Sequence, residues 1–219
     1  MSTNEFSPGV AADAADVAEG SWGDEAEAVE LTADDVLADV RSTARAMVRA
    51  GCCTFEQVLG RALELAALAD DAPSAGSVER VVRHEWDVRA AALAQADPAA
   101  SDHVRVERAF AALGREGVAA RLGFSCCREC GEAELREVLP DGGAYALVTQ
   151  PDLEQLAAGR LVVRCGVLRA DEARAEAAVR DVVGRVVAAL TEQGLDARAD
   201  GRTVVVHVRE WAKPLPAAA

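Results

Sequence analysis

The sequence contains few lysines and few aromatic side chains. Lys213 is the only lysine among 219 residues, aromatic residues make up 4% of the chain, and the formal net charge is −14. An acidic chain without a Lys/Arg cluster repels a phosphate backbone, so we expect no binding to nucleic acid. Hydrophobic residues still account for 51% of the sequence, which predicts a core built from small aliphatic side chains.

Long apolar runs are missing as well. No stretch reaches the roughly 18 apolar residues of a membrane-spanning helix, so we expect no membrane partner. The first residues lack the basic start and the apolar segment of a secretory signal peptide. We therefore expect a cytoplasmic protein whose cysteines are mostly reduced. The six cysteines are Cys52, Cys53, Cys126, Cys127, Cys130 and Cys165.

Motifs of common enzyme classes are also absent. The sequence has no G-x-S-x-G motif, no Walker loop and no G-x-G-x-x-G fingerprint. His84-Glu85 lacks the second histidine of a zinc metallohydrolase, because Val88 occupies its position. His103 stands near an expected helix start and is predicted to be solvated. The sequence thus favours a protein without catalytic activity, although it leaves the question open.

The composition of the chain changes near residue 31. Residues 1–30 contain eight acidic residues and no Lys or Arg, and they lack a repeating apolar face. We predict that residues 1–31 form a disordered acidic tail, which would offer a binding segment to a protein partner.

Residues 32–116 have the periodicity of helices. Apolar residues recur every three to four positions, and Thr32-Ala-Asp-Asp35 and Thr54-Phe-Glu-Gln57 have the composition of helix starts. Two further helices are expected over residues 78–95 and 101–115. This segment is therefore predicted to be a helical subdomain.

Residues 117–212 alternate between strand-like apolar runs and helical patterns. The expected strands include residues 118–124, 145–149 and 161–168, and the clearest helix covers residues 171–193. Asp200-Gly201 indicates a C-terminal hairpin, and helices between strands favour crossover connections. The fold class is accordingly predicted to be α+β with a mixed sheet. We expect residues 32–212 to form one continuous domain and residues 213–219 to be a frayed tail.

Three thiols within five residues, at Cys126, Cys127 and Cys130, form the most informative motif. The two-residue spacer of Cys127-x-x-Cys130 turns both sulfurs toward a common centre, as in zinc sites, and Cys126 is a third candidate ligand. We therefore predict a structural metal site with zinc as the expected ion. The sequence has no second C-x-x-C to complete it. Candidates for the fourth ligand are Cys165 and His207, followed by Cys52, Cys53, His84 and His103.

Thiol redox chemistry is the alternative. The order strand, C-x-x-C, helix is typical of thioredoxin-like proteins, and a helix N-terminus beside Arg128 favours a thiolate at Cys127 with Cys130 as resolving thiol. The usual Trp-Cys-Gly-Pro-Cys context is absent. Two further interpretations stay open: the cysteines pack as small apolar residues, or the chain is a protein-interaction module without catalysis.

The cysteine motif also carries a family resemblance. Phe124-Ser-Cys-Cys-Arg-Glu-Cys-Gly131, preceded by Gly117-Val-Ala-Ala-Arg121, resembles the motif F-[ST]-C-C-x-x-C-G of an uncharacterised bacterial family of unknown function. The resemblance extends from about residue 33 to the region of Trp211. Thr149 stands where relatives tend to have a histidine. The resemblance implies no known activity, but it implies that the cysteine cluster is a feature of the family.

Overall fold

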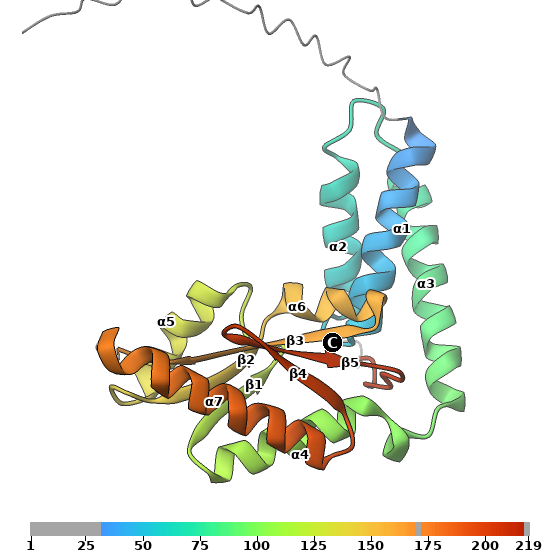
Figure 1. Cartoon of the computed structure of the whole chain (residues 1–219). Helices are drawn as coiled ribbons and strands as arrows, with labels where there is room; N and C mark the ends of the chain where they lie inside the picture. Colours follow the sequence, from blue (N-terminus) through green and yellow to red (C-terminus); the bar gives the residue numbers. More distant parts are fainter. Residues whose placement is uncertain (1–31, 170–171, 217–219) are drawn as a thin grey trace, which may run out of the picture. The chain divides into compact units, whose positions relative to one another are not determined.

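The fold combines helices with one mixed β-sheet (Figure 1). The computed structural model describes residues 32–169 and 172–216, so the predicted acidic tail lies outside the described residues. The α-helices are α1 (Ala33–Ala50), α2 (Phe55–Ala66), α3 (Ala75–Gln95), α4 (Asp102–Arg115), α5 (Arg128–Val138), α6 (Gln150–Glu154) and α7 (Glu172–Glu192). The strands are β1 (Val118–Leu122), β2 (Ala144–Val148), β3 (Arg160–Val167), β4 (Asp196–Asp200) and β5 (Thr203–His207), and the short 3-10 helices are η1 (Pro98–Ala100) and η2 (Gln155–Ala158). This arrangement confirms the predicted α+β class. Within the described ranges, no helix has the length and apolar character needed to cross a membrane.

The five strands lie in the order β1-β2-β3-β5-β4. Strands β1 and β2 run parallel and are joined by the crossover helix α5, whereas all other neighbours are antiparallel. The C-terminal hairpin is present, but its turn is Gly201-Arg202 rather than Asp200-Gly201, because Asp200 still pairs with Thr203. Gly201 has φ 58°, in the left-handed region that tight hairpin turns use.

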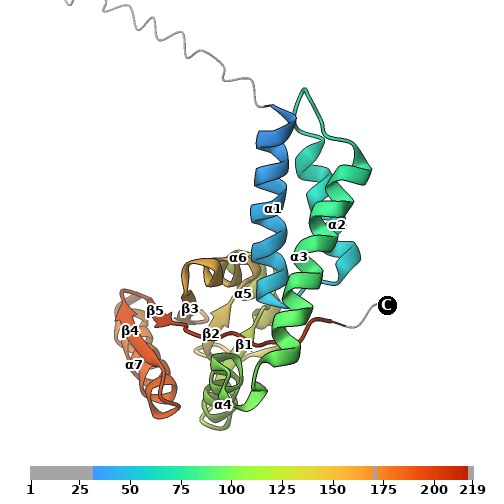
Figure 2. The same cartoon turned by 90° about the vertical axis from the view of Figure 1, so that its right-hand side faces the viewer.

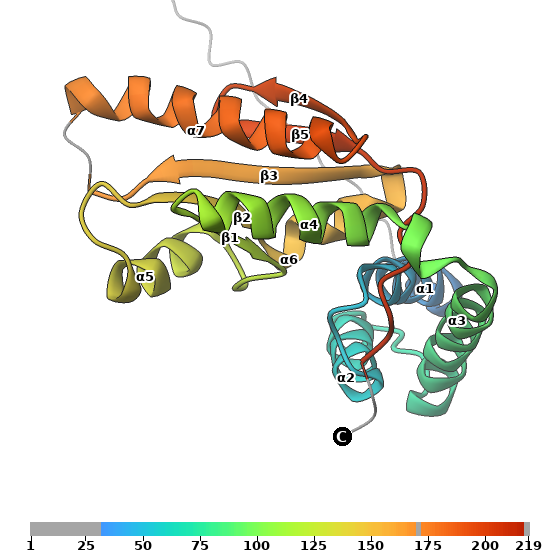
Figure 3. The same cartoon turned by 90° about the horizontal axis from the view of Figure 1, so that it is seen from below.

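Alternate residues of a strand face two different layers. On β2, Ala146 and Val148 belong to the main core, whereas Tyr145 and Leu147 belong to a smaller core that includes Leu135 of α5. Helices α4 and α7 cover the first face of the sheet, and α5 and α6 lie on the opposite side (Figure 1). Figure 3 shows α4 and α7 side by side across the sheet, where they contact each other.

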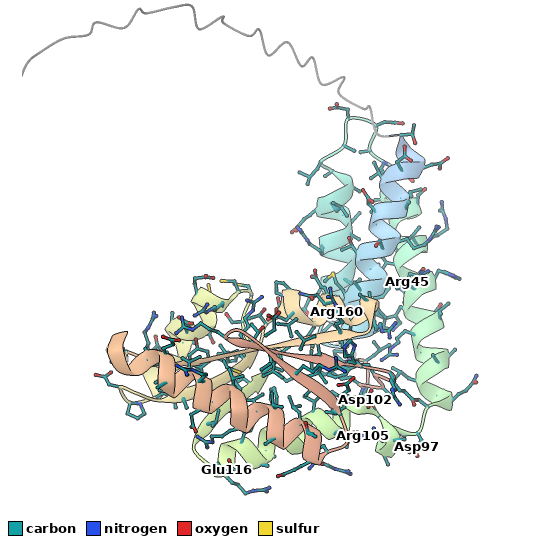
Figure 4. The ribbon with its side chains drawn as sticks, viewed as in Figure 1. Arg45, Asp97, Asp102, Arg105, Glu116 and Arg160 are labelled. Carbon is teal, nitrogen blue, oxygen red and sulfur yellow. The ribbon has the colours of Figure 1, made fainter. Side chains whose placement is uncertain are left out.

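Helices α1, α2 and α3 pack around a separate core of valine and alanine (Figure 2). The helix starts predicted at Thr32 and Thr54 are both present as capping boxes, and Gly51 ends α1 with φ 68°. Arg45 of α1, labelled in Figure 4, donates two hydrogen bonds to the buried carboxylate of Glu85 on α3, at 2.9 and 3.1 Å. These contacts hold α1 against α3.

Helix α4 packs with the sheet rather than with α1, α2 and α3. Its apolar residues Val106, Phe110 and Leu113 lie in the main core, where α4 contacts β1 and α7. The sequence pattern predicts this helix as part of the helical subdomain 32–116, because periodicity identifies an apolar face without showing which core that face joins.

The C-terminal segment is anchored on the start of α4. The carboxylate of Asp102, labelled in Figure 4, accepts hydrogen bonds from the backbone N–H groups of Arg209 and Glu210, at 2.8 and 3.1 Å. Leu215 then packs against the core of α1, α2 and α3. Residues 213–216 are therefore docked, although the sequence predicts a frayed tail over residues 213–219.

Candidate metal centre

Three free thiols meet at the N-terminal end of α5. The Sγ atoms of Cys126, Cys127 and Cys130 all lie within 4.8 Å of one another. Cys126 and Cys130 are exposed and Cys127 is half-buried, so an ion from solvent reaches the group directly. Across the described part of the chain, no other group of three or more His, Cys, Asp or Glu ligand atoms converges in this way.

A left-handed turn places Cys126 beside the other two cysteines. Ser125 has φ 66°, a conformation that costs a non-glycine residue about 1 kcal/mol. Its carbonyl oxygen accepts a hydrogen bond from the N–H of Gln150 at 3.2 Å, and the N–H of Phe124 donates to the carbonyl oxygen of Val148 at 3.0 Å. The turn is thus held against the end of β2 and the start of α6. Strain that the surrounding structure enforces is common at functional sites.

Cys127 is the N-cap residue of α5. Its Sγ accepts a hydrogen bond from the N–H of Cys130 at 3.4 Å, which brings both sulfurs to the same turn. Gly131 lets this turn approach the sheet, because a Cβ at Gly131 would stand only 3.1 Å from Cδ1 of Leu147. Packing of the first turn against β2 therefore explains why a glycine follows the last cysteine of the motif.

Glu132 fixes α5 to β2. Its carboxylate accepts a hydrogen bond from the Tyr145 hydroxyl and another from Nε of Arg128 at 2.7 Å. Burial, followed by the bond to Glu132, raises the pKa of Tyr145 to about 12. Burial opposes ionisation of Glu132, but the hydrogen bonds from Tyr145 and Arg128 lower the pKa of its carboxyl group overall. At neutral pH the phenol therefore donates to a carboxylate, and the helix that carries Cys130 stays attached to the sheet.

The three thiols influence one another's ionisation. Hydrogen bonds with Cys130, and then with Cys127, lower the pKa of Cys126. Contacts with Cys127, and then with Cys126, raise the pKa of Cys130 to about 12. In a group of thiols this close together, the thiol that ionises first accepts hydrogen bonds from its neighbours, which lowers its pKa. A neighbour that donates such a bond then holds its own proton more tightly, which raises its pKa. A cation that replaced those protons would stabilise more than one thiolate.

Comparison with known families identifies the chain at the level of its domain. A family model described as a domain of unknown function, DUF6891, matches residues 33–215. The chain belongs to the DUF6891 family. The match spans every described helix and strand as well as the cysteine group, and it confirms the expected membership of a family of unknown function. No curated protein and no solved structure matches the chain.

In the DUF6891 domain, the two leading candidates for a fourth ligand do not lie in the three-thiol group. Cys165 on β3 is 2% exposed and lies in the main core, where burial raises its pKa to about 12. His207 is exposed at the end of β5 and pairs across the sheet with Arg160 and Asp196. Neither residue is a member of the group formed by the thiols.

The other fourth-ligand candidates also lie outside the group. Cys52 and Cys53 follow α1 and are half-buried, and His84 is exposed on α3. The prediction that His103 is solvated is wrong: it is 5% exposed, and its ring packs edge-on against Trp211 with centroids 5.1 Å apart. Burial lowers the pKa of His103. Because Trp211 comes from the far end of the DUF6891 domain, no local pattern indicates this burial.

Lys213 has a contact that the sequence analysis misses. Its Nζ lies 2.9 Å from Sγ of Cys52, although 161 positions separate the two residues. The only signal in the sequence is that Lys213 is the sole lysine among 23 Lys and Arg residues.

Proposed function

We propose that this DUF6891 domain binds a zinc ion through the thiolates of Cys126, Cys127 and Cys130. The observation that carries the proposal is the convergence of three sulfur atoms within 4.8 Å at the accessible start of one helix. Thiolate sulfur is a preferred ligand of zinc. Three thiolates this close together would repel one another, and a bound cation would offset that repulsion, which is why the convergence of three sulfurs favours a metal.

Zinc requires only a small contraction of the group. A Zn–S bond of about 2.3 Å in a tetrahedral site sets the sulfur atoms about 3.8 Å apart. The side chains of Cys126 and Cys130 are exposed, so we expect rotation about χ1 to bring their sulfurs inward. This rotation does not require a change of the backbone turn at Ser125 or of the N-cap position of Cys127.

The fourth coordination position is proposed to be open. Cys165 is buried in the main core and His207 lies at the end of β5, which supports a ligand from outside the chain. Zinc with three protein ligands and one exchangeable position is typical of reactive sites, whereas closed structural sites have four protein ligands. We propose water, or a side chain of another protein molecule, as the fourth ligand. We also propose a cytoplasmic location, where the thiols would stay reduced.

Metal analysis tests the proposal directly. Protein purified without chelator is expected to contain about one equivalent of zinc by elemental analysis, because thiolate zinc sites bind with about 10 kcal/mol or more. Cys127→Ser removes the central ligand, and its zinc content is expected to fall below about a tenth of an equivalent. Titration of the apoprotein with Co²⁺ should produce the charge-transfer absorption of a cobalt thiolate in the wild type and not in Cys127→Ser.

Cys53→Ser is the matched control, because Cys53 is a half-buried thiol outside the group; this variant should keep its zinc. Cys165→Ala and His207→Ala test the open position, and both should also keep zinc. Loss of zinc in either variant would assign that residue as the fourth ligand and refute the open position. Wild-type protein with neither zinc nor a cobalt band would refute metal binding altogether.

Thiol redox chemistry at Cys127 and Cys130 is the second candidate, and the proximity and accessibility of these sulfurs favour it. The candidate requires metal-free protein in which Cys127 reacts with iodoacetamide faster than free cysteine, and in which oxidation yields a Cys127–Cys130 disulfide in peptide maps. A bound zinc ion protects both thiols from alkylation. Labelling with and without added zinc therefore separates the two functions.

A further inference from the structure

Cys52 and Lys213 form a thiol–amine contact that the three-thiol group does not involve. Nζ of Lys213 donates a hydrogen bond to Sγ of Cys52 over 2.9 Å, in a partly buried position. Reacting atoms in near-attack geometries lie about 3–3.5 Å apart. The amine nitrogen and the sulfur therefore stand at reacting distance without any rearrangement of the fold.

Close backbone packing fixes both partners. A Cβ at Gly51, the residue before Cys52, would stand 3.2 Å from Cγ and from the carbonyl oxygen of Lys213, so the lysine stem lies directly on the end of α1. A Cβ at Gly123 would stand 3.0 Å from Sγ of Cys52, so the connection after β1 packs against the sulfur. The indole N–H of Trp211 also donates to a carbonyl oxygen at the end of α1 over 3.4 Å. The amine is therefore held on the sulfur by its own chain segment.

The chemical identity of Lys213 is distinctive in this chain. Among 23 Lys and Arg residues it is the only lysine, and thus the only side-chain primary amine. An arginine would supply the same positive charge, but a guanidinium stays protonated and does not act as a nucleophile. The only side-chain primary amine of the chain lies against a thiol. A purely electrostatic role at this position would not require an amine, because an arginine would fill it equally well.

A cavity of about 650 Å³ gives small molecules access to the pair, since Cys52 and Lys213 both line it. His103 lines the same cavity, its side chain is 6% exposed, and its Nδ1 has no hydrogen-bond partner in the described structure. Nε2 lies 3.2 Å from a carboxylate oxygen of Glu107 but is not well aligned for a hydrogen bond. Buried nitrogens are normally paired, so the imidazole has unused hydrogen-bonding capacity behind the cavity wall. Its nitrogens are covered by neighbouring atoms, so a small molecule such as hydrogen peroxide would reach them only after a small movement of this wall.

We propose that Cys52 and Lys213 are a peroxide-responsive modification site, at which oxidation joins the two side chains through a sulfur–nitrogen bond. In the first step hydrogen peroxide transfers an oxygen atom to the thiol: its O–O bond breaks, Cys52 becomes a sulfenic acid and one water leaves. In the second step the lone pair of the Lys213 amine attacks the sulfur. The S–O bond breaks, an S–N bond forms, and hydroxide leaves as water with a proton from nitrogen. Sulfur is oxidised by two electrons, and one peroxide is reduced to two waters.

The bond would fasten the C-terminal segment to the end of α1. In the reduced protein this segment is held by hydrogen bonds to Asp102 and by packing of Leu215. A covalent link between positions 161 residues apart constrains the unfolded chain as a disulfide does. A thiol reductant reverses the link by attacking sulfur and releasing the amine. The oxidised protein is therefore expected to unfold at higher temperature than the reduced protein.

Peptide mapping of the peroxide-treated, full-length protein tests the proposal. Remaining thiols are blocked with N-ethylmaleimide, and the protein is digested with trypsin without reductant. Cys52 then lies in the peptide 50–61, and Lys213 lies in 210–219, because Pro214 prevents cleavage after the lysine. The expected product is these two peptides joined, with Cys53 carrying one N-ethylmaleimide. It should be about 2 Da lighter than the sum of 210–219 and the peptide 50–61 alkylated at Cys53 alone, because two hydrogens are lost on forming the S–N bond. Dithiothreitol should separate them.

Two variants define the assignment. Cys53→Ser keeps Cys52 and should keep the joined peptides, whereas Lys213→Arg keeps the charge and should lower their yield at least about tenfold, because the amine held in contact is gone. A Cys52–Cys53 disulfide within 50–61, or oxygenated Cys52 without joined peptides, would overturn the proposal. Joined peptides of any other mass would overturn the sulfur–nitrogen bond. The wild-type map decides the question even if Lys213→Arg fails to fold.

Discussion

Replacing Gly166 by alanine is expected to lower the free energy of unfolding by about 3 kcal/mol or more. Gly166 on β3 pairs with Tyr145 on β2, and a Cβ at this position would stand 2.2 Å from Cζ and from the hydroxyl oxygen of the tyrosine. Tyr145 is 2% exposed, so its ring cannot yield without leaving the smaller core and its hydrogen bond to Glu132. Urea unfolding of the variant and the wild type measures the difference.

Gly184→Ala is the control for this substitution. Gly184 lies inside α7, and a Cβ there meets nothing within 4 Å. Alanine is the better helix former, so this variant is expected to gain about 0.5–1 kcal/mol of stability. If Gly166→Ala were as stable as the wild type, the tyrosine ring would not lie over Gly166, and the packing of α5 on β2 would need another explanation.

Replacing Asp152 by alanine is expected to cost about 3 kcal/mol, the lower end of the range for breaking a buried ion pair. The carboxylate is fully buried and accepts hydrogen bonds from Nε and a terminal nitrogen of Arg164 at 2.8 and 2.7 Å. It also accepts bonds from the N–H and hydroxyl of Thr149, at 3.1 and 2.6 Å. Alanine leaves these donors unpaired. Arg164 is 35% exposed and regains part of its hydration, which is why we expect the lower end of the range.

Asp141→Ala separates the effect of burial from the effect of the ion pair. Asp141 contacts Arg169 at the same 2.7 Å, but the two side chains are 69% and 52% exposed. An exposed pair contributes at most about 1 kcal/mol, so this variant should unfold close to the wild type in urea. Equal losses in Asp152→Ala and Asp141→Ala would contradict the argument that the buried, unpaired donors carry the cost.

Local features of the fold could be predicted because their causes are local. Thr32 and Thr54 cap helices through contacts three residues away, and both capping boxes are present. Helix α3 shows the limit of this reasoning: it begins at Ala75, earlier than predicted, because Ser74 caps it by accepting a hydrogen bond from the N–H of Ser77. A serine in a polar loop is a weak signal, since such residues also occur in turns.

The candidate metal centre was partly predictable for the same reason. Spacing indicates that Cys127 and Cys130 share one helical turn, and the structure places their sulfurs together. The position of Cys126 depends on the left-handed backbone at Ser125, which is held by a hydrogen bond from Gln150. No propensity marks a serine for that conformation, so only the packed structure brings the third thiol into the group.

The sequence by itself determined the α+β class, the helix caps at Thr32 and Thr54 and the pairing of Cys127 with Cys130, because each depends on residues a few positions apart. The tertiary structure alone decided that α4 joins the sheet, that His103 is buried under Trp211, and that Lys213 touches Cys52. These contacts join distant parts of the chain. They depend on which apolar faces meet and which strands pair, and a period of 3.6 or 2 residues identifies a face but not its partner.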